Sequence, residues 1–506
     1  MATSLSDFLQ PLSIDTAKVH RLAQALCETF RSLARESENQ FLSTPISESV
    51  LRPDGDESGR HVSQQFSSSL GDWLSEPRGG TNLRVGFIEL LCPSDHALNG
   101  FPNGESSRVR RLLEKAWPIG EQLKNEKAED LFAWIGHCIA EVVRDASTAW
   151  NGELAPELPM GVTFSFPMIQ HTLSDATLMS MGKGFAITSN LDLGRQLLQG
   201  YESHRGTLPR IRIAAIANDT VATLVSFCFQ AQNQPGCKAA MGLIGGTGSN
   251  ATIPLFPRLL HASKRPNSDE TKIVVNTEWS INGAAPPLQT LGLITPWDKI
   301  LDLQGEVPGF QPFEYMTAGR YLGELGRLIL LDYLTSIRSI PPARIPQRLQ
   351  TRHGLTTAFL GNIRPDAPQI LQQLDAELPG PEGWSWTTEL AQMLYSIAKA
   401  IQVRAAGLTA AAVLGLLGCA EELDINHLQR SLKPGITELM VGYTGGCIVH
   451  FQDYLHDCQA FLDAITRGGA VGVQLHPCHD GGIIGAGILA GRVSRTESIE
   501  SGKRVG

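Results

Sequence analysis

The sequence predicts an α/β chain with two lobes, and three observations support this fold class. Its 506 residues are too many for one compact core, so two or three domains with a cleft between lobes are expected. From residue 83 onward, short apolar runs that end in Gly, Asn or Asp alternate with helical segments. Helical patterns then dominate residues 313–429, which predicts a large helical insertion. The predicted strands cover residues 83–91, 161–166, 211–216, 240–244 and 272–275.

The N-terminal segment carries one apolar stripe at helical spacing and predicts a helix that docks on the larger lobe. Ser, Asp, Gly and Gln dominate residues 36–69, and Pro45 and Pro53 interrupt that stretch, so an irregular connection is expected there. The stripe consists of Val19, Leu22, Leu26, Phe30 and Leu33.

Charge and cysteine content limit the classes of function. The formal net charge of −9, with both signs dispersed and no Lys/Arg-rich run, argues against a nucleic-acid partner. Nine cysteines without regular spacing indicate reduced thiols. The first residues lack a basic region followed by an apolar run, so a cytoplasmic protein is expected, with nuclear or mitochondrial-surface association left open.

Residues 405–420 form the stretch most suggestive of a membrane, since Ala, Leu and Gly dominate it. It falls short of the about 20 apolar residues that a membrane span needs, and it has no aromatic belt. A helix buried in a core is therefore expected, and no transmembrane segment.

Polar clusters lie at four strand ends or turns, and in an open α/β sheet such ends converge on one crevice. The turn at 79–82 (Gly-Gly-Thr-Asn) suits either a hairpin or an anion held by backbone amides. Asp219 suits a turn or a base for a substrate hydroxyl. Loop 245–250 offers amides and hydroxyls to a phosphate but lacks the P-loop Lys. Glu278 suits a capped strand end or a second site carboxylate.

A further polar run, at 476–480 (His-Pro-Cys-His-Asp), has side chains that bind metals. No second Cys/His pair lies at zinc-site spacing, so no metal site is predicted.

The order of these clusters resembles the eukaryotic hexokinase family over roughly residues 79–487. Residues 159–167, followed by Gln170 and the Lys183-Gly184-Phe185 segment, resemble the sugar-binding signature of that family. Residues 218–224 (Asn-Asp-Thr-Val-Ala-Thr-Leu) resemble the segment that carries its catalytic Asp. Further matches follow at family-like intervals, at residues 246–250, 276–279, 308–324 and 404–411.

The resemblance implies a two-lobed actin-like ATPase fold that binds a hexose such as glucose. Asp219 is then expected to be the catalytic residue, which accepts the proton of the terminal sugar hydroxyl as that oxygen attacks the γ-phosphate. ATP and Mg²⁺ are the cofactors expected of an active enzyme. The implied hexose-binding residues are Ser165, Lys183, Asn218, Asp219, Asn250, Glu278 and Glu314. The implied nucleotide-binding residues are Gly79, Gly80, Thr81, Asn82, Gly246, Thr247, Gly248 and Gly445.

The same resemblance divides the chain into four parts. Residues 1–70 hold the docking helix and the irregular connection, and residues 71–217 form the small lobe. Residues 218–470 form the large lobe, and residues 471–506 return to the small lobe and end in a tail.

Departures from the family pattern gather on the nucleotide side. Pro77-Arg78 stands where the family has Asp-Leu, so the carboxylate that directs the magnesium nucleotide is missing unless a shifted turn brings Glu76 into its place. Thr444 replaces an Asp, and the branched Ile483 replaces a Gly where the backbone is expected to bend closely. Losing a group that stabilises the transition state costs about 3–4 kcal/mol.

The sugar side departs less, with Met181-Gly182 replacing a Trp-Thr pair and Ala222 replacing a Gly. Loss of the hydroxyl at Gly182 removes one hydrogen bond, about 0.5–1.5 kcal/mol. Two readings follow. The chain is a sugar sensor with a regulatory protein partner, as in the atypical hexokinase-like branch known in fungi, or it is an ATP-dependent hexose kinase that uses Asp219.

Overall fold

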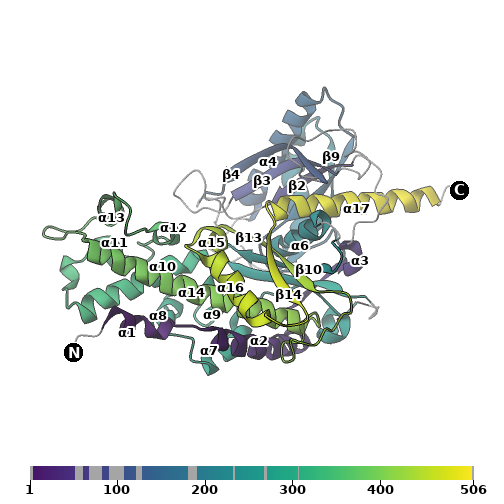
Figure 1. The fold of residues 1–506 in the computed structure, drawn as a ribbon. Helices are drawn as coiled ribbons and strands as arrows, with labels where there is room; N and C mark the ends of the chain where they lie inside the picture. Colours follow the sequence, from purple (N-terminus) through teal and green to yellow (C-terminus); the bar gives the residue numbers. More distant parts are fainter. Residues whose placement is uncertain are drawn as a thin grey trace.

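The computed structural model shows two lobes, each built around its own β-sheet (Figure 1). The upper lobe in this view carries a five-stranded sheet, and the lower lobe carries a six-stranded sheet together with most of the helices. The predicted two-lobed α/β fold is therefore confirmed. The structure describes residues 4–51, 61–67, 82–90, 108–120, 123, 128–179, 191–231, 234–266, 271–305 and 307–503.

The six-stranded sheet of the large lobe has the order β1-β12-β11-β10-β13-β14. β13 runs parallel to both β10 and β14, and the other neighbouring strands pair antiparallel. Every residue of β12 is buried, which is typical of a strand covered on both faces. The strands are β1 (Leu42–Ser47), β10 (Cys237–Gly245), β11 (Ser249–Leu255), β12 (Ile273–Asn276), β13 (Glu438–Thr444) and β14 (Gly472–Pro477).

The five-stranded sheet of the small lobe has the order β4-β3-β2-β5-β9, and β2, β5 and β9 run parallel. Helices α4 (Ala128–Ala149) and α5 (Leu193–Arg205) contact each other and this sheet, where Phe87, Phe132 and Val162 share one core. The strands are β2 (His61–Ser67), β3 (Asn82–Leu90), β4 (Val109–Pro118), β5 (Glu157–Thr163) and β9 (Arg210–Ala217). A small separate sheet holds β6 (Met168–Ile169), β7 (Thr177–Leu178) and β8 (Leu191–Asp192).

The five predicted strands overlap β3, β5, β9, β10 and β12, with ends shifted by a few residues. The prediction of an irregular connection over residues 36–69 was wrong at residues 42–47 and 61–67, where β1 and β2 lie. Pro45 argued against a strand at β1. However, β1 is an edge strand with a register irregularity between Ser43 and Ser47, and a sheet tolerates proline at such a place. The Ser and Gln residues of β2 hid a strand that lies in the middle of its sheet.

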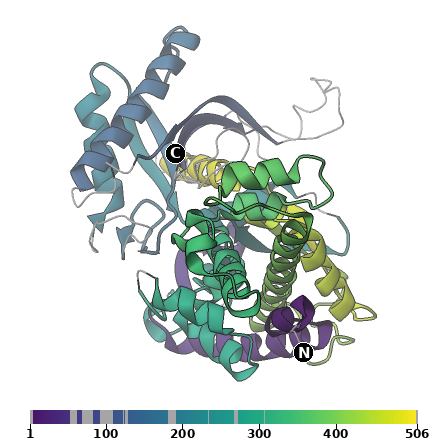
Figure 2. The same cartoon turned by 90° about the vertical axis from the view of Figure 1, so that its left-hand side faces the viewer.

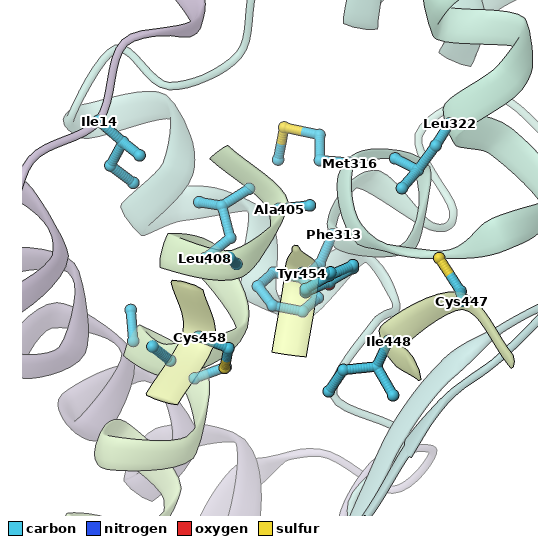
Figure 3. Packing of buried hydrophobic residues seen from close by; sticks show 14 of the residues in the cluster. Ile14, Phe313, Met316, Leu322, Ala405, Leu408, Cys447, Ile448, Tyr454 and Cys458 are labelled. Carbon is cyan, nitrogen blue, oxygen red and sulfur yellow. The ribbon is translucent and has the colours of Figure 1, made fainter. Parts of the chain in front are cut away.

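The N-terminal helix α2 (Thr16–Glu36) docks along the long helix α14 (Thr388–Cys419), as predicted. Its apolar stripe is buried apart from the half-buried Leu33, and Arg31 Nη2 donates to Gly418 O at 3.0 Å. Figure 2 shows the N-terminal segment beside the other helices of the large lobe. In the core, Leu408 of α14 lies near Tyr454 and Cys458 (Figure 3).

Residues 405–420 fall in α14 and its C-cap, and nearly all of them are fully buried, which confirms the predicted core helix. Among the residues that the structure describes, α14 is the one helix that is both long enough and apolar enough to cross a membrane. Of its most apolar 18-residue window, 89% is buried inside the protein.

The C-terminal segment contributes elements to both lobes. β14 belongs to the large-lobe sheet, whereas helix α17 (Gly481–Lys503) packs on α6 (Asp219–Gln230) and on strands β2 and β5 of the small lobe (Figure 1). The predicted divisions at residues 70 and 470 therefore do not follow the sheets, because β2 and β14 lie on the unexpected side of each.

The remaining helices mostly belong to the large lobe. They are α1 (Leu5–Leu9), α3 (Glu48–Leu51), α7 (Ala285–Thr290), α8 (Pro296–Leu303), α9 (Pro312–Thr317), α10 (Gly319–Asp332), α11 (Gln347–Gln350), α12 (Thr357–Asn362), α13 (Ile370–Glu377), α15 (Gly446–His450) and α16 (Tyr454–Thr466).

Candidate functional site

Two parallel strands of the small lobe bring Ser165 and Asp219 to one edge. β5 and β9 pair in parallel, with Thr163 opposite Ala217, and Phe164 N donates to Ala217 O at 2.9 Å. Ser165 and Asp219 each lie two residues beyond that pair. Because the carboxyl ends of parallel strands share an edge, both side chains belong to the same end of the small-lobe sheet.

Asp219 begins helix α6 directly after β9. Asn218 caps this helix, since its Oδ1 accepts from Thr220 N at 3.0 Å. Asp219 Oδ1 accepts from Thr220 N at 2.8 Å, and Thr223 Oγ1 donates to Asp219 O at 2.9 Å. The bond from Thr220 N holds the half-buried carboxylate in the first helical turn, where a negative charge is favoured.

Helix α6 also joins the two lobes. It lies so close to β10 that a Cβ at Gly242 would be 3.0 Å from Leu224 N and 3.1 Å from Thr220 O. The first turn of α6 therefore lies beside Gly242 of β10. β10 ends three residues later, at Gly245, and the loop to β11 begins there. This packing brings Asp219 toward the polar strand ends of the large lobe.

Three side chains at the ends of β11 and β12 form one hydrogen-bonded network. Asn276 Nδ2 donates to Glu278 Oε1 at 2.8 Å, and Asn250 Nδ2 donates to the same oxygen at 3.3 Å. Asn250 Nδ2 also lies 2.8 Å from Asn276 Oδ1. The backbone of Glu278 is left-handed, with φ +47, a conformation that non-glycine residues adopt mainly where their surroundings hold them.

Glu314 approaches this network from helix α9. Glu314 is 6% exposed as a residue, and its Oε2 accepts from Ser249 N at 3.2 Å. A Cβ at Gly248 would lie 3.0 Å from the same oxygen, so glycine gives the carboxylate its space. Trp279 Nε1 donates to Ser249 Oγ at 3.2 Å and braces the strand end behind it. A buried carboxylate needs polar partners, and a bound sugar hydroxyl would add one.

Glycine turns form the expected nucleotide side of the large lobe. Gly246 N donates to Gly248 O at 3.0 Å in the turn between β10 and β11. Gly445, with φ +123, follows β13 at Thr444, and a Cβ there would lie 2.5 Å from Gly245 C. Only glycine can sit at 445, because both its φ and this close backbone approach exclude a side chain. The two turns therefore lie against each other.

The expectation that Ile483 crowds a closely bending loop was wrong. Ile483 lies in the first turn of helix α17, where no special backbone angle is needed, and its side chain is 1% exposed. It shares a core cluster with Val221, Ala222 and Val274. The close approach falls two residues later, where a Cβ at Gly485 would lie 1.9 Å from Ala222 O. Ile483 is a core residue.

Asp480, before α17, forms ion pairs with two arginines of the small-lobe sheet. Its carboxylate lies 2.7 Å from Arg84 Nη1 and 2.7 Å from Arg111 Nη1. In the described part of the chain, no three or more His, Cys, Asp and Glu residues form a group that could hold a metal.

Several predicted residues lie outside the described part of the chain. Asn82 begins β3, but its side chain is not among those described. The structure brings together Asn250, Glu278 and Glu314 on the large lobe, and Ser165, Asn218 and Asp219 on the small-lobe edge and α6. The predicted residues that lie outside the described part of the chain are Lys183, Gly79, Gly80, Thr81, the Pro77-Arg78 segment and the Met181-Gly182 segment.

Sequence reasoning missed three residues that support this site. Asn276 stood in a recognised segment, but nothing marked its amide as a partner of Glu278. Ser249 braces the strand end through its amide and hydroxyl. Gln40 contacts Glu278 from the N-terminal segment, far away in sequence, and no local pattern signals such a contact.

Comparisons with known proteins show the family and the fold of this chain. Two family models, both described as Hexokinase, match residues 4–229 and 240–492. Hexokinase-2 of Rattus norvegicus is 32% identical over 305 residues, which are 60% of this chain but only 30% of the rat protein. Hexokinase of Schistosoma mansoni is 29% identical over 370 residues, 72% of each chain. The solved structure of the Schistosoma mansoni hexokinase complexed with glucose covers 96% of this chain and 98% of its own, with a TM-score of 0.73 and 24% identity.

Proposed function

This chain belongs to the hexokinase family, and we propose that it binds a hexose, such as glucose, with weakened or absent ATP:hexose 6-phosphotransferase activity. Its role on this proposal is that of a sugar sensor or regulator of the response to carbon and nutrients. The supporting positions are the ends of β9, β11 and β12 and helix α9, which carry Asp219, Asn250, Glu278 and Glu314.

The observation that carries hexose binding is the network of Asn250, Asn276 and Glu278 beside Glu314. Vicinal sugar hydroxyls are donors and acceptors at once, so fixed carboxylates and amides can each satisfy two of them. These side chains hold one another before a ligand arrives, which lowers the entropy cost of binding.

Weakened phosphoryl transfer rests on the sequence. Pro77 stands at the position of the metal-directing Asp, and Thr444 replaces another Asp on the adenosine side. Because phosphoryl transfer depends mainly on positioning and charge stabilisation of the γ-phosphate, these changes lower the rate even where the base is retained. Ile483 no longer supports this argument, since its side chain is buried in the core.

The glycine turns fit a nucleotide. A Cβ at Gly246 would meet Gly445 Cα at 3.7 Å, an ordinary contact, so the two turns pack together, and backbone amides in such glycine turns can hold phosphate oxygens. Gly246, Thr247, Gly248 and Gly445 are the described residues that would hold ATP with Mg²⁺ if the protein is active. Bound ATP would supply the phosphoryl group, and Asp219 would accept the proton of the attacking hydroxyl.

The second candidate is an active ATP-dependent hexokinase that phosphorylates glucose or a related hexose at the 6-hydroxyl. The position of Asp219 favours it, because that carboxylate is fixed in the first turn of α6 beside β10. A turnover of about 10–10² per second, within the ordinary range for kinases, would establish this candidate.

Calorimetry with glucose, and then with ATP and Mg²⁺ in its presence, tests the proposal directly. We expect glucose to bind, Glu278→Gln to weaken its binding by at least tenfold, and ATP turnover to stay far below the kinase range. Glucose binding no tighter than that of a non-metabolised sugar alcohol would refute the sugar site.

A regulatory protein partner and a cytoplasmic location are the remaining parts of the proposal. A sensor needs a surface that differs between its sugar-free and sugar-bound states. Glucose-dependent co-purification from extracts of cells that express the tagged protein, together with its localisation by microscopy, tests both.

A further inference from the structure

We propose that Gln40 is a positioning residue of the sugar site, which holds Glu278 in its binding conformation from the N-terminal segment. The proposal rests on the hexose binding proposed above and adds a residue that lies 238 positions away from Glu278 in sequence. It also assigns the segment between α2 and β1 a role in sugar affinity.

The contact between Gln40 and Glu278 is direct. Gln40 is 2% exposed, and its Nε2 donates to Glu278 O at 3.0 Å. The next residue adds a second link, because Phe41 N donates to Thr277 O at 3.0 Å. Two consecutive residues of the N-terminal segment thus bind the backbone of the two residues that follow β12.

Gln40 is itself held firmly. Its own N donates to Ser37 Oγ at 3.1 Å, and Lys264 Nζ donates to Gln40 O at 2.7 Å. Lys264 also donates to Ser37 O, so one ammonium group joins the end of α2 to Gln40. The backbone N and O of Gln40 are therefore both held, so its buried side-chain amide reaches Glu278 from a fixed position.

The backbone conformation of Glu278 explains why such a donor matters. A left-handed glutamate is strained and persists only where neighbouring groups determine it. The carbonyl of Glu278 accepts from Ile281 N at 3.3 Å and from Gln40, so Gln40 supplies the shorter of these two bonds. Relaxation of this backbone would turn the carboxylate away from Asn250 and Asn276, and so away from the sugar.

The relation is reciprocal. If the N-terminal segment favours the conformation of Glu278 that binds sugar, then sugar binding must stabilise the N-terminal segment to the same extent. Hexose is thus expected to slow hydrogen exchange at residues 38–43, although these residues need not touch the ligand.

The test compares Gln40→Met with Gln24→Met. Methionine keeps the length of the side chain and removes the amide. Gln24 is a matched control, because its Nε2 donates to Asn426 Oδ1 at the surface, in the same N-terminal region but away from the site. By calorimetry with glucose, we expect about tenfold weaker binding for Gln40→Met and a change of less than twofold for Gln24→Met. In a Glu278→Gln background, Gln40→Met should cause no further loss.

The outcomes separate the two proposals. If the unmodified protein does not bind glucose, the proposed function fails and this inference fails with it. If the unmodified protein and Gln24→Met bind glucose and Gln40→Met binds it equally well, only this inference fails. An additional loss in the Glu278→Gln background would reveal a general structural defect and overturn the positioning role. Should Gln40→Met not fold, hydrogen exchange of the unmodified protein decides, and unchanged exchange at residues 38–43 with glucose overturns the inference.

Discussion

The proposed sugar side and the proposed nucleotide side of this site are built differently. On the sugar side, side chains carry the binding groups, and Asn250, Asn276 and Glu278 hold one another in place. On the nucleotide side, backbone turns at 245–248 and 445–446 provide the surface, and their geometry depends on where a side chain is absent. The effect of a substitution on the sugar side can therefore be inferred from the side-chain group that it removes. On the nucleotide side, the effect of a substitution depends on the backbone conformation at that position.

Ile483 illustrates the difference. A branched residue in place of a family glycine indicated a damaged loop, but the position is helical and the side chain fills a core between α6 and α17. A glycine is needed at 485, where the helices touch, and the chain has kept it. Loss of a glycine damages a site only where φ or a close approach requires glycine.

The largest expected effect separates the base from the rest of the site. Asp219→Asn should lower any glucose-dependent ATP turnover by about 10²–10⁴, because general-base catalysis contributes that much. Glucose affinity should change far less, since the amide keeps the size and one acceptor. Coupled-enzyme assays and calorimetry measure the two quantities. Turnover unaffected by Asp219→Asn would show that this carboxylate is not the base.

The next effect tests the corrected interpretation of Ile483. Ile483→Gly should lower the free energy of unfolding by about 3–5 kcal/mol, because it leaves a cavity and places a glycine in a helix. It should not raise ATP turnover. Thermal and urea unfolding measure the first quantity, with Ile169→Gly as a control at an exposed site, where the loss should be much smaller. A gain in turnover would restore the view that Ile483 blocks the nucleotide.

A smaller effect is expected where the family places its metal-directing carboxylate. Pro77→Asp should raise glucose-dependent turnover by about ten- to a hundredfold, since it returns a group that orients the metal-bound phosphate. Adding Asp219→Asn should remove that gain. Turnover that does not respond to Pro77→Asp would place the defect elsewhere on the nucleotide side.

The sequence predicted the elements whose own residues specify them. The α2 stripe, the apolar α14 and the buried runs at β9, β10 and β12 all have the period or composition of the structure that they form. β1 and β2 lack that signal, because an edge position tolerates Pro45 and because pairing with neighbouring strands, more than composition, makes β2 a strand.

The candidate site divides in the same way. The order of motifs indicated Asp219, Glu278 and Glu314, because each follows a strand end or opens a helix in a recognisable segment. The partners that position them could not be predicted, since Gln40 and Ser249 reach the site through contacts between distant parts of the chain. Long-range packing decides such contacts, and no local pattern reports it.

The smallest expected effect compares two neighbouring glycines of one turn. A Cβ at Gly248 would meet Glu314 Oε2 at 3.0 Å, which is closer than a relaxed contact, whereas a Cβ at Gly246 would meet nothing closer than 3.7 Å. Neither residue has a positive φ, so alanine fits the backbone at both. Gly248→Ala should weaken glucose binding about three- to tenfold by displacing that carboxylate, and it should leave stability almost unchanged.

Gly246→Ala should instead leave glucose affinity within twofold and lower ATP affinity, because it adds a methyl group to the turn that is proposed to hold the phosphates. Calorimetry with each ligand measures both variants under the same conditions. If both alanine substitutions weakened glucose binding equally, the turn would contact both ligands. The division into a side-chain site for sugar and a backbone site for nucleotide would then be wrong. Opposite preferences in two residues that are separated only by Thr247 would place the boundary between the two sides within this turn.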